Sequence, residues 1–222
     1  MWLGDGHSYS ANISVGRDDV EQFEKLFEVV NKKEDKTCFS YRVATLTHSQ
    51  LRVNNLLKNK HIPTEYLRAS IEQRTELLQG MMDSDGSVSN TGCEFYTSSP
   101  ALLRGFLSLA RSLGYKCRSR SKQSKLYGVP KQTAYTVWFL NHSDKEVFKY
   151  TRKQDKVINC ETYRATRKTI RSITPVPSVP SRCITVDNKD HLYLCGEHYT
   201  VTHNTELMRK LEHNLLANHP TV

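Results

Sequence analysis

Two copies of an Asp-Gly ending, eighty residues apart, carry carboxylates that could bind a divalent cation. The longer copy spans residues 77–86, where an apolar helical pattern runs into Asp85. In the shorter copy, residues 2–6, Asp5 takes the corresponding place. A helix dipole disfavours an anion at its C-terminal end unless a cation takes up the charge. Because oxygen ligands suit Mg²⁺, the two aspartates indicate a site for Mg²⁺ or another divalent cation.

The two aspartates would meet if their helices packed through Gly4 and Gly80, since glycine lets two backbones approach closely. Two carboxylates brought so close need a cation between them. Such a cation can activate water and stabilise the leaving oxygen in phosphodiester hydrolysis. The alternative is that Asp83 and Asp85 form only a helix end and a turn.

A second reactive group lies near the end of the chain, in the tripeptide His203-Asn204-Thr205. The side-chain amide of Asn204 could attack its own backbone carbonyl, form a succinimide and break the bond to Thr205. His203 could act as general acid for the leaving group, and the Thr205 hydroxyl could first accept an acyl chain as an ester. Alone, such a tripeptide indicates nothing, so its meaning depends on the segment before it.

The composition favours a polyanionic partner. The chain has 222 residues and a formal net charge of +9, although a merely basic surface would give the same charge. Its six cysteines include no C-x-x-C pair, which argues against a zinc site and for a reducing compartment. No apolar run approaches the roughly 20 residues that span a membrane. We therefore expect no membrane partner and a cytoplasmic location in a bacterial or phage-infected cell.

The elements around the aspartates predict an α+β fold with two similar halves. The first half is predicted to contain a helix over residues 18–31, a strand over 39–43 and a helix over 51–57. The second half opens with a helix capped by Ser70 and Gln73. The predicted elements that follow are a strand over 93–96, a helix over 99–114, strands over 115–122 and 133–140, and a helix over 144–152.

The last fifty residues have a different character. The proline-rich stretch 174–181 predicts a linker or an extended segment. Beyond it, alternating residues predict strands over 182–186, 191–195 and 199–202, and a helical pattern fills residues 205–219.

The segment from Leu78 to Gly86 resembles the LAGLIDADG signature of double-motif homing endonucleases. It matches that signature at Leu78, Gly80, Asp83, Asp85 and Gly86, and residues 2–6 are similar to the end of the first motif. The resemblance implies a pseudo-two-fold αββαββα domain with the metal on Asp5 and Asp85. It also implies paired sheets that follow the groove of double-stranded DNA. The candidate DNA-binding residues are Lys116, Arg118, Arg120, Lys122, Lys125 and Lys131.

Residues 182–205 resemble the C-terminal splicing motifs of an intein. The resemblance lies in Arg182-Cys183-Ile184-Thr185-Val186-Asp187, in His191-Leu192-Tyr193 and in Val201-Thr202-His203-Asn204-Thr205. It implies that His203 and Asn204 end the intein, that Thr205 begins the C-extein and that His191 assists the cyclisation of Asn204. Cys183 is a candidate first nucleophile, or else a small buried hydrophobe. These strands would be the C-terminal strands of a Hint-type splicing domain.

Together the two resemblances predict the C-terminal part of an intein that carries a DOD-type LAGLIDADG endonuclease. The expected domains are the endonuclease at 1–165, with its first motif cut short at Met1, the splicing segment at 172–204 and a host fragment at 205–222. We expect the N-terminal intein portion and a host protein as partners, the latter a P-loop ATPase such as a phage terminase or a helicase. The alternatives are a free-standing LAGLIDADG endonuclease and a catalytically inactive DNA-binding remnant.

Overall fold

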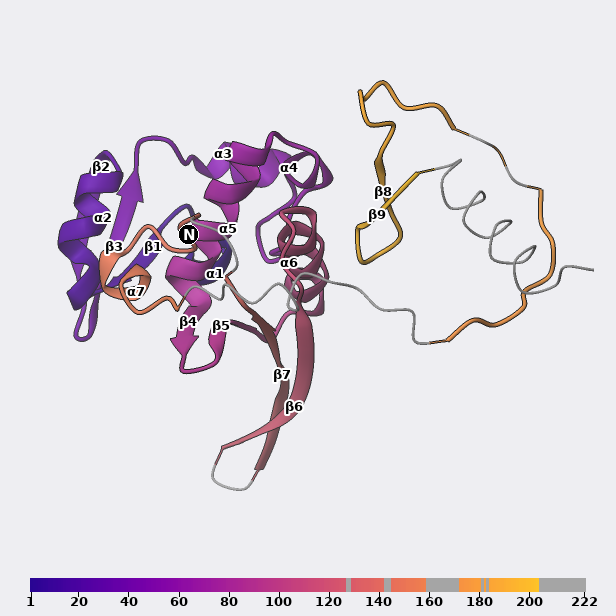
Figure 1. Cartoon of the computed structure of the whole chain (residues 1–222). Helices are drawn as coiled ribbons and strands as arrows, with labels where there is room; N and C mark the ends of the chain where they lie inside the picture. Colours follow the sequence, from indigo (N-terminus) through magenta and orange to yellow (C-terminus); the bar gives the residue numbers. More distant parts are fainter. Residues whose placement is uncertain (127–128, 142–144, 159–171, 181, 183, 204–222) are drawn as a thin grey trace, which may run out of the picture. The chain divides into compact units, whose positions relative to one another are not determined.

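The computed structural model describes all residues except 127–128, 142–144, 159–171, 181, 183 and 204–222 (Figure 1). The chain divides into two compact units, Met1–Arg167 and Lys168–Val222. Cys183, Asn204, Thr205 and the helix predicted over 205–219 lie outside the described residues. No helix in the described part is long and apolar enough to cross a membrane.

The first half of the larger unit contains one three-stranded antiparallel sheet in the order β1-β3-β2. Gly6 adds a single antiparallel bridge to Ile13 at the outer edge of β1. The elements are α1 (Trp2–Asp5), β1 (Ile13–Gly16), η1 (Arg17–Asp19), α2 (Val20–Leu26), β2 (Val29–Glu34), β3 (Cys38–Val43), α3 (His48–Val53) and α4 (Thr64–Leu67).

The second half repeats this arrangement with a four-stranded antiparallel sheet in the order β4-β5-β7-β6. In the first sheet Gly6 pairs with the outer edge of β1, and in the second sheet β4 pairs with the outer edge of β5. The strands of the two sheets therefore follow the same spatial order. The predicted α+β organisation with antiparallel sheets is confirmed. The elements are α5 (Ile71–Asp85), β4 (Gly86–Ser89), β5 (Gly92–Thr97), α6 (Pro100–Ser112), β6 (Arg118–Leu126), β7 (Val129–Phe139) and α7 (Thr151–Gln154).

Local signals account for the two long helices. The Ser70 hydroxyl accepts from the backbone N–H of Gln73, and the Gln73 side-chain oxygen accepts from the backbone N–H of Ser70. This is the capping box that the sequence predicts for α5. Ser99 caps α6, and Pro100 occupies its first turn. Gly114, at φ +94°, ends the following turn in a conformation that favours glycine.

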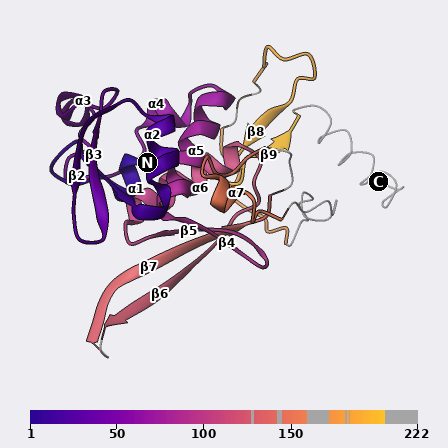
Figure 2. The ribbon, with the colours of Figure 1, turned by 90° about the vertical axis from the view of Figure 1, so that its left-hand side faces the viewer.

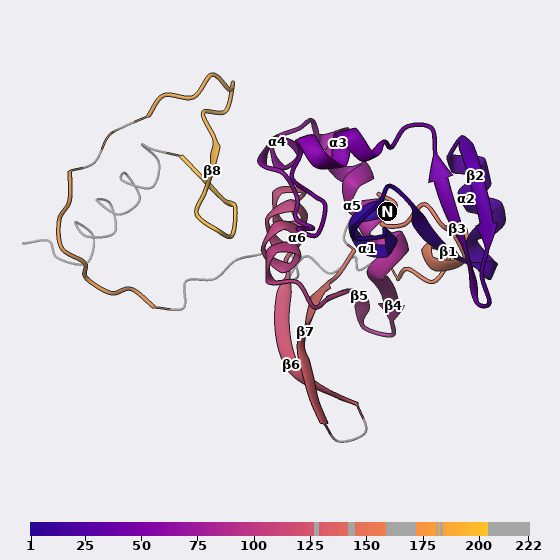
Figure 3. The ribbon, with the colours of Figure 1, turned by 180° about the vertical axis from the view of Figure 1, so that it is seen from behind.

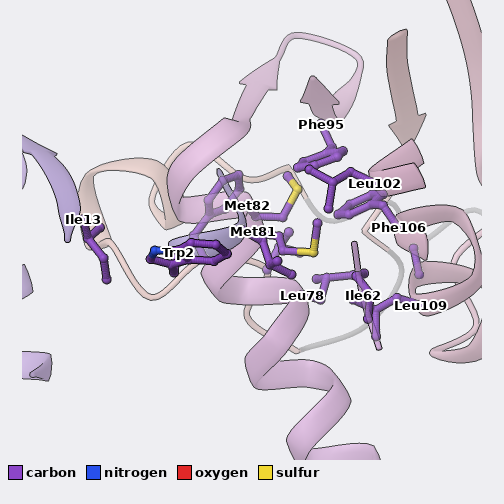
Figure 4. Close-up of a cluster of buried hydrophobic side chains, with 14 of the residues drawn as sticks. Trp2, Ile13, Ile62, Leu78, Met81, Met82, Phe95, Leu102, Phe106 and Leu109 are labelled. Carbon is purple, nitrogen blue, oxygen red and sulfur yellow. The ribbon is translucent and has the colours of Figure 1, made fainter. Parts of the chain in front are cut away.

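One hydrophobic core joins both halves around α5 (Figure 4). Leu78, Met81 and Met82 are almost fully buried and form the apolar face of α5. On the second-half side, the rings of Phe95 and Phe106 stack with centroids 4.0 Å apart. The other side chains of this cluster include Trp2 and Ile13 from the first half, so the halves share their interior.

The helix predicted over 18–31 was wrong in its second part. Helix α2 ends at Leu26, and Val29 begins strand β2, which pairs with β3. Val29 and Val30 are β-branched and favour a strand, and pairing with β3 fixes that choice.

The helix predicted over 144–152 was also wrong. Between residues 145 and 158, only Thr151–Gln154 is helical. Val147, Phe148 and Tyr150 before it are buried, and side chains rather than a helix bind their backbone N–H groups. The apolar spacing there reflects burial of a non-helical segment.

The smaller unit contains a two-stranded antiparallel sheet of β8 (Tyr193–Cys195) and β9 (Thr200–Thr202). Gly196, at φ +69°, opens the turn between them. The strand predicted over 182–186 is absent from residues 182 and 184–186, which the structure describes as irregular. The pairing therefore joins 193–195 to 200–202, and the Hint-type arrangement stays a prediction.

Candidate active site at the paired helix ends

Helices α1 and α5 contact each other through two glycines, which brings their C-terminal ends together. A Cβ atom added at Gly4 would lie 2.2 Å from the Ser84 Oγ and 2.7 Å from the Asp85 Oδ2. A Cβ atom added at Gly80 would lie 2.8 Å from the Met1 backbone nitrogen. A side chain at either position would therefore force the helices apart. The helices pack through these two glycines, as the sequence predicts.

Asp5 and Asp85 are the last residues of α1 and α5 and are partly buried at this junction. Burial raises the pKa of both carboxyls, and the charge of Asp5 raises the pKa of Asp85 further. The two carboxylates therefore repel each other when both are ionised. Nearby positive charges, including Lys60 and Lys153, partly offset these shifts.

Lys60 lies at the end of α1. Its Nζ donates to the carbonyl oxygens of Gly4 and Gly6, at 2.6 Å each, and stands 5.1 Å from the centre of the Trp2 ring. The last carbonyls of a helix have no intrahelical donor, so an ammonium there stabilises the helix end. Burial lowers the pKa of Lys60, and the two neighbouring aspartates oppose that shift.

Lys153 binds backbone carbonyls at the end of α5, as Lys60 does at the end of α1. Its Nζ donates to the carbonyl oxygens of Asp83 at 2.6 Å, Gly86 at 2.8 Å and Met82 at 3.2 Å. Burial lowers the pKa of Lys153 as well. Both lysines thus contact the carbonyl of the glycine that follows the paired aspartate, Gly6 in one half and Gly86 in the other.

Sequence reasoning missed both lysines. Lys60 follows Asp5 by 55 residues and lies in the loop between α3 and α4. Lys153 follows Asp85 by 68 residues and lies on α7. The two halves differ in loop length and in the element that carries the lysine, so no repeated spacing marks the pair.

Asp83 has a different environment from Asp85. Its buried carboxylate accepts from the backbone N–H of Tyr150 at 3.0 Å and of Lys149 at 3.1 Å. The corresponding residue of α1 is Leu3, which is buried in the core. Asp83 therefore fixes the segment before α7.

The carboxylate pair suits a hard divalent cation. In the part of the chain that the structure describes, no group of three or more histidine, cysteine or acidic side chains could hold a metal. Mg²⁺ is commonly bound by only one or two carboxylates and completes its shell with water and substrate phosphates. Two repelling, partly buried carboxylates fit that requirement.

The outer face of the second sheet, opposite α6, is polar. Cross-strand register puts Glu94, Trp138 and Arg118 in one row, and Tyr96, Thr136 and Arg120 in the next. The Arg118 guanidinium lies 5.9 Å from the centre of the Trp138 ring. Strands β6 and β7 project beyond the rest of this sheet as a long hairpin (Figure 2).

The six basic residues predicted to bind DNA gather on this hairpin and its approach. Arg118, Arg120 and Lys122 alternate along β6 and are exposed on its outer face. Lys116 is exposed just before β6, whereas the backbones of Lys125 and Lys131 lie in β6 and β7.

The first sheet, whose strands β1, β3 and β2 lie at the right of Figure 3, also has a polar face. Ser14, Ser40 and Lys33 form one row across its strands, and Arg42 and Asn31 form the next. Lys33 and Arg42 are exposed. Sequence reasoning did not single them out: the helix predicted over 18–31 took up the start of β2, so Lys33 was not placed on a strand, and Arg42 lies in the strand predicted over 39–43.

Two of the predicted splicing residues come together in the smaller unit. The rings of His191 and His203 stand with their centroids 6.1 Å apart at an interplanar angle of 85°. The other three, Cys183, Asn204 and Thr205, lie outside the described residues.

The chain matches a known family in part. A family model described as homing endonuclease matches residues 61–166. The replicative DNA helicase DnaB of Mycobacterium intracellulare is 36% identical over 210 residues, which are 93% of this chain and 34% of the helicase. The chain thus spans about a third of the length of the curated relative that it matches.

Solved structures of the homing endonuclease I-DmoI are also similar to the chain. Mesophilic variants of I-DmoI give a TM-score of 0.42 and 13% identity, covering 62% of this chain and 83% of theirs. I-DmoI in complex with DNA and Mn gives a TM-score of 0.37 and 14% identity, covering 58% of this chain and 72% of its own.

Proposed function

We propose that this chain, whose residues 61–166 match a family model described as homing endonuclease, cleaves double-stranded DNA at a specific site with Mg²⁺ or another divalent cation. The observation that carries the proposal is the meeting of Asp5 and Asp85 at two packed helix ends, each flanked by a lysine. The family match contains Asp85 and Lys153, and Asp5 and Lys60 are their first-half counterparts.

In this proposal Asp5 and Asp85 hold the cation, which would polarise the scissile phosphate and activate water. Lys60 and Lys153 keep positive charge next to both carboxylates. When DNA enters, their ammonium groups can turn from helix carbonyls toward phosphate oxygens. The packed glycines keep the two carboxylates at one junction, so the two antiparallel strands of a duplex would meet equivalent groups.

The experiment that tests the proposal is cleavage of a random DNA library. The protein, expressed from its full reading frame, is incubated with the library and Mg²⁺, and the cut ends are sequenced. We expect double-strand breaks within one family of sequences and none in EDTA. Absence of cleavage, or cleavage without sequence preference, would overturn the proposal.

The outer faces of the two sheets are proposed to contact the DNA. Replacing Arg118 and Arg120 together with glutamine is expected to weaken binding and to lower the slope of log K against log salt by about 2, because each phosphate contact contributes about 0.9. Fluorescence anisotropy over a salt series measures this slope. Glu72→Gln, on an exposed turn of α5, is the control. An unchanged slope would show that the DNA binds to another surface of the protein.

We further propose that residues 172–204 are an intein splicing segment and that the host is a replicative helicase. The 36% identity to a DnaB helicase over nearly the whole chain supports an intein in such a host. The edge-to-face approach of His191 and His203 supports a shared role for the two imidazoles next to the proposed cleavage point. Cys183 and Thr205 are the proposed acyl carriers.

Replacing Asn204 with alanine is expected to block release of the segment that begins at Thr205, because alanine has no amide to form a succinimide. Mass spectrometry of the purified chain after incubation measures that release. Gln154→Ala, in the larger unit, should leave it unchanged. Equal release from the Asn204 variant would refute the role.

A further inference from the structure

All four side chains of α7 are engaged in fixed contacts. Lys153 binds the end of α5, and the Gln154 Oε1 accepts from the backbone N–H of Val147 at 2.9 Å and of Phe148 at 3.0 Å. The remaining two, Thr151 and Arg152, both contact the first half of the unit. A helix of four residues has little stability of its own, so these contacts fix its position.

The first half holds α7 through one charged and one neutral side chain. Arg152 binds Asp19 in bidentate fashion, with Nε to Oδ1 at 2.5 Å and Nη2 to Oδ2 at 2.6 Å. The Asp19 side chain is only 11% exposed and the Arg152 side chain 44%, so the carboxylate is shielded from solvent while the guanidinium is partly screened. The Gln22 side chain accepts from the Thr151 N–H at 2.9 Å and donates to the Thr151 Oγ1 at 2.8 Å.

The two lysines are held differently. Lys153 lies on an element that side chains of both halves fix, since Asp83 also binds the backbone just before α7. Lys60 lies in a loop, where the Lys58 N–H donates to the Ser8 carbonyl oxygen at 2.8 Å within the same half, and Ile62 packs against Gly105 of α6. Among the described residues, hydrogen bonds to the opposite half thus hold the element that carries Lys153, whereas an apolar contact holds the loop that carries Lys60.

We propose that Asp19 and Gln22 of the first half are positioning residues for Lys153, and that their contacts with α7 couple one half of the molecule to the cleavage site of the other. The inference rests on the proposed endonuclease function. Helix α2, which carries Gln22, packs its Phe23 ring 4.8 Å from the Tyr41 ring, on the face of the first sheet opposite Ser40 and Arg42. The contacts with α7 can therefore act on the cleavage rate without forming part of the proposed DNA surface.

The coupling has a strand-specific signature. The pseudo-two-fold arrangement relates Lys60 and Lys153, and the two strands of a duplex are related in the same way. Each lysine therefore serves mainly one strand. Loosening α7 displaces Lys153 alone, so one strand is cut slowly and nicked DNA accumulates.

The test compares Asp19→Asn and Arg152→Gln with a matched control. Glu34→Gln breaks the Arg17–Glu34 pair, whose side chains are 51% and 63% exposed, and leaves α7 untouched. Lys153→Met and Lys60→Met identify the strand that each lysine serves. For each protein the single-turnover cleavage rate of both strands and the Kd for DNA are measured, together with hydrogen exchange of the Thr151 and Lys153 amides.

We expect Asp19→Asn and Arg152→Gln to slow the strand that Lys153→Met slows, by about 10- to 100-fold, as is typical when a supporting residue of a reactive site is lost. The Kd, the other strand and the Glu34→Gln control should stay within about twofold, and the two amides should exchange faster. Equal slowing of both strands, a loss of rate that follows Kd, or unchanged rates would overturn the proposal.

The exchange measurement separates this inference from the proposed function. If the wild-type protein, expressed from its full reading frame, cleaves no DNA, the endonuclease proposal fails. Faster exchange of the Thr151 and Lys153 amides in Asp19→Asn would then still support the α7 contacts as a coupling between halves. Unchanged exchange would overturn the coupling whether or not the protein cleaves.

Discussion

Replacing Asp85 with asparagine is expected to lower the single-turnover rate of DNA cleavage about 1,000-fold, which corresponds to about 4 kcal/mol of lost transition-state stabilisation. Asparagine has the shape of aspartate but lacks the charge that a divalent cation requires. Because the variant also removes a partly buried charge that Asp5 repels, the metal-free protein should be at least as stable as the wild type.

Quenched-flow cleavage assays and thermal unfolding without metal give the two measurements. Asp5→Asn should have the same effect on the rate, since it is the partner in the pair. Glu76→Gln, an exposed acid on the same helix α5, is the matched control and should cleave normally. Cleavage by the Asp85 variant at the wild-type rate would remove Asp85 from the site. A variant that unfolds more readily than the wild type would contradict the stability prediction.

Replacing Gly4 with alanine is expected to separate the helix ends and to slow cleavage about 100-fold, since a displacement of about 1 Å at a reacting centre can cost that much. The new Cβ would stand 2.2 Å from the Ser84 Oγ and 2.6 Å from the Ser84 Cβ. Rotating the hydroxyl relieves the first contact but not the second, so the backbones must move. Overpacking of this kind costs about 1 to 3 kcal/mol of stability.

Gly16→Ala is the matched control for the Gly4 variant. A Cβ atom at Gly16 would meet its nearest atom at 3.8 Å, which is an ordinary contact, and the backbone conformation at φ −63° suits alanine. Urea unfolding and cleavage of both variants should therefore differ clearly. If Gly4→Ala cleaves as fast as Gly16→Ala, the close contact between α1 and α5 does not determine the rate.

The sequence was sufficient for the elements whose signals are local. The apolar spacing of Leu78, Met81 and Met82, the capping box at Ser70 and the Ser99-Pro100 start predicted α5 and α6. The position of the carboxylate pair was predictable because the Asp-Gly ending is repeated and glycines at matching places allow the helices to touch.

What the sequence did not reveal depends on contacts between distant segments. Strand β2 contains exposed charged residues and exists because it pairs with β3. Helix α7 is short because side chains from α5 and the first half bind the backbone around it. Lys60 reaches the site from a loop and Lys153 from helix α7, at different distances along the chain from their aspartates, and no local pattern encodes that convergence.

The position of β6 at the edge of its sheet limits which basic residues of the proposed DNA-binding surface can be replaced without promoting aggregation. In the order β4-β5-β7-β6, no strand within the described ranges pairs with the outer side of β6, which is where another copy of a chain could add and start aggregation. The exposed charges of Arg118, Arg120 and Lys122 along it oppose such strand addition. The cations proposed to attract DNA thus also keep the protein dispersed, and light scattering should accompany any binding measurement on variants that neutralise them.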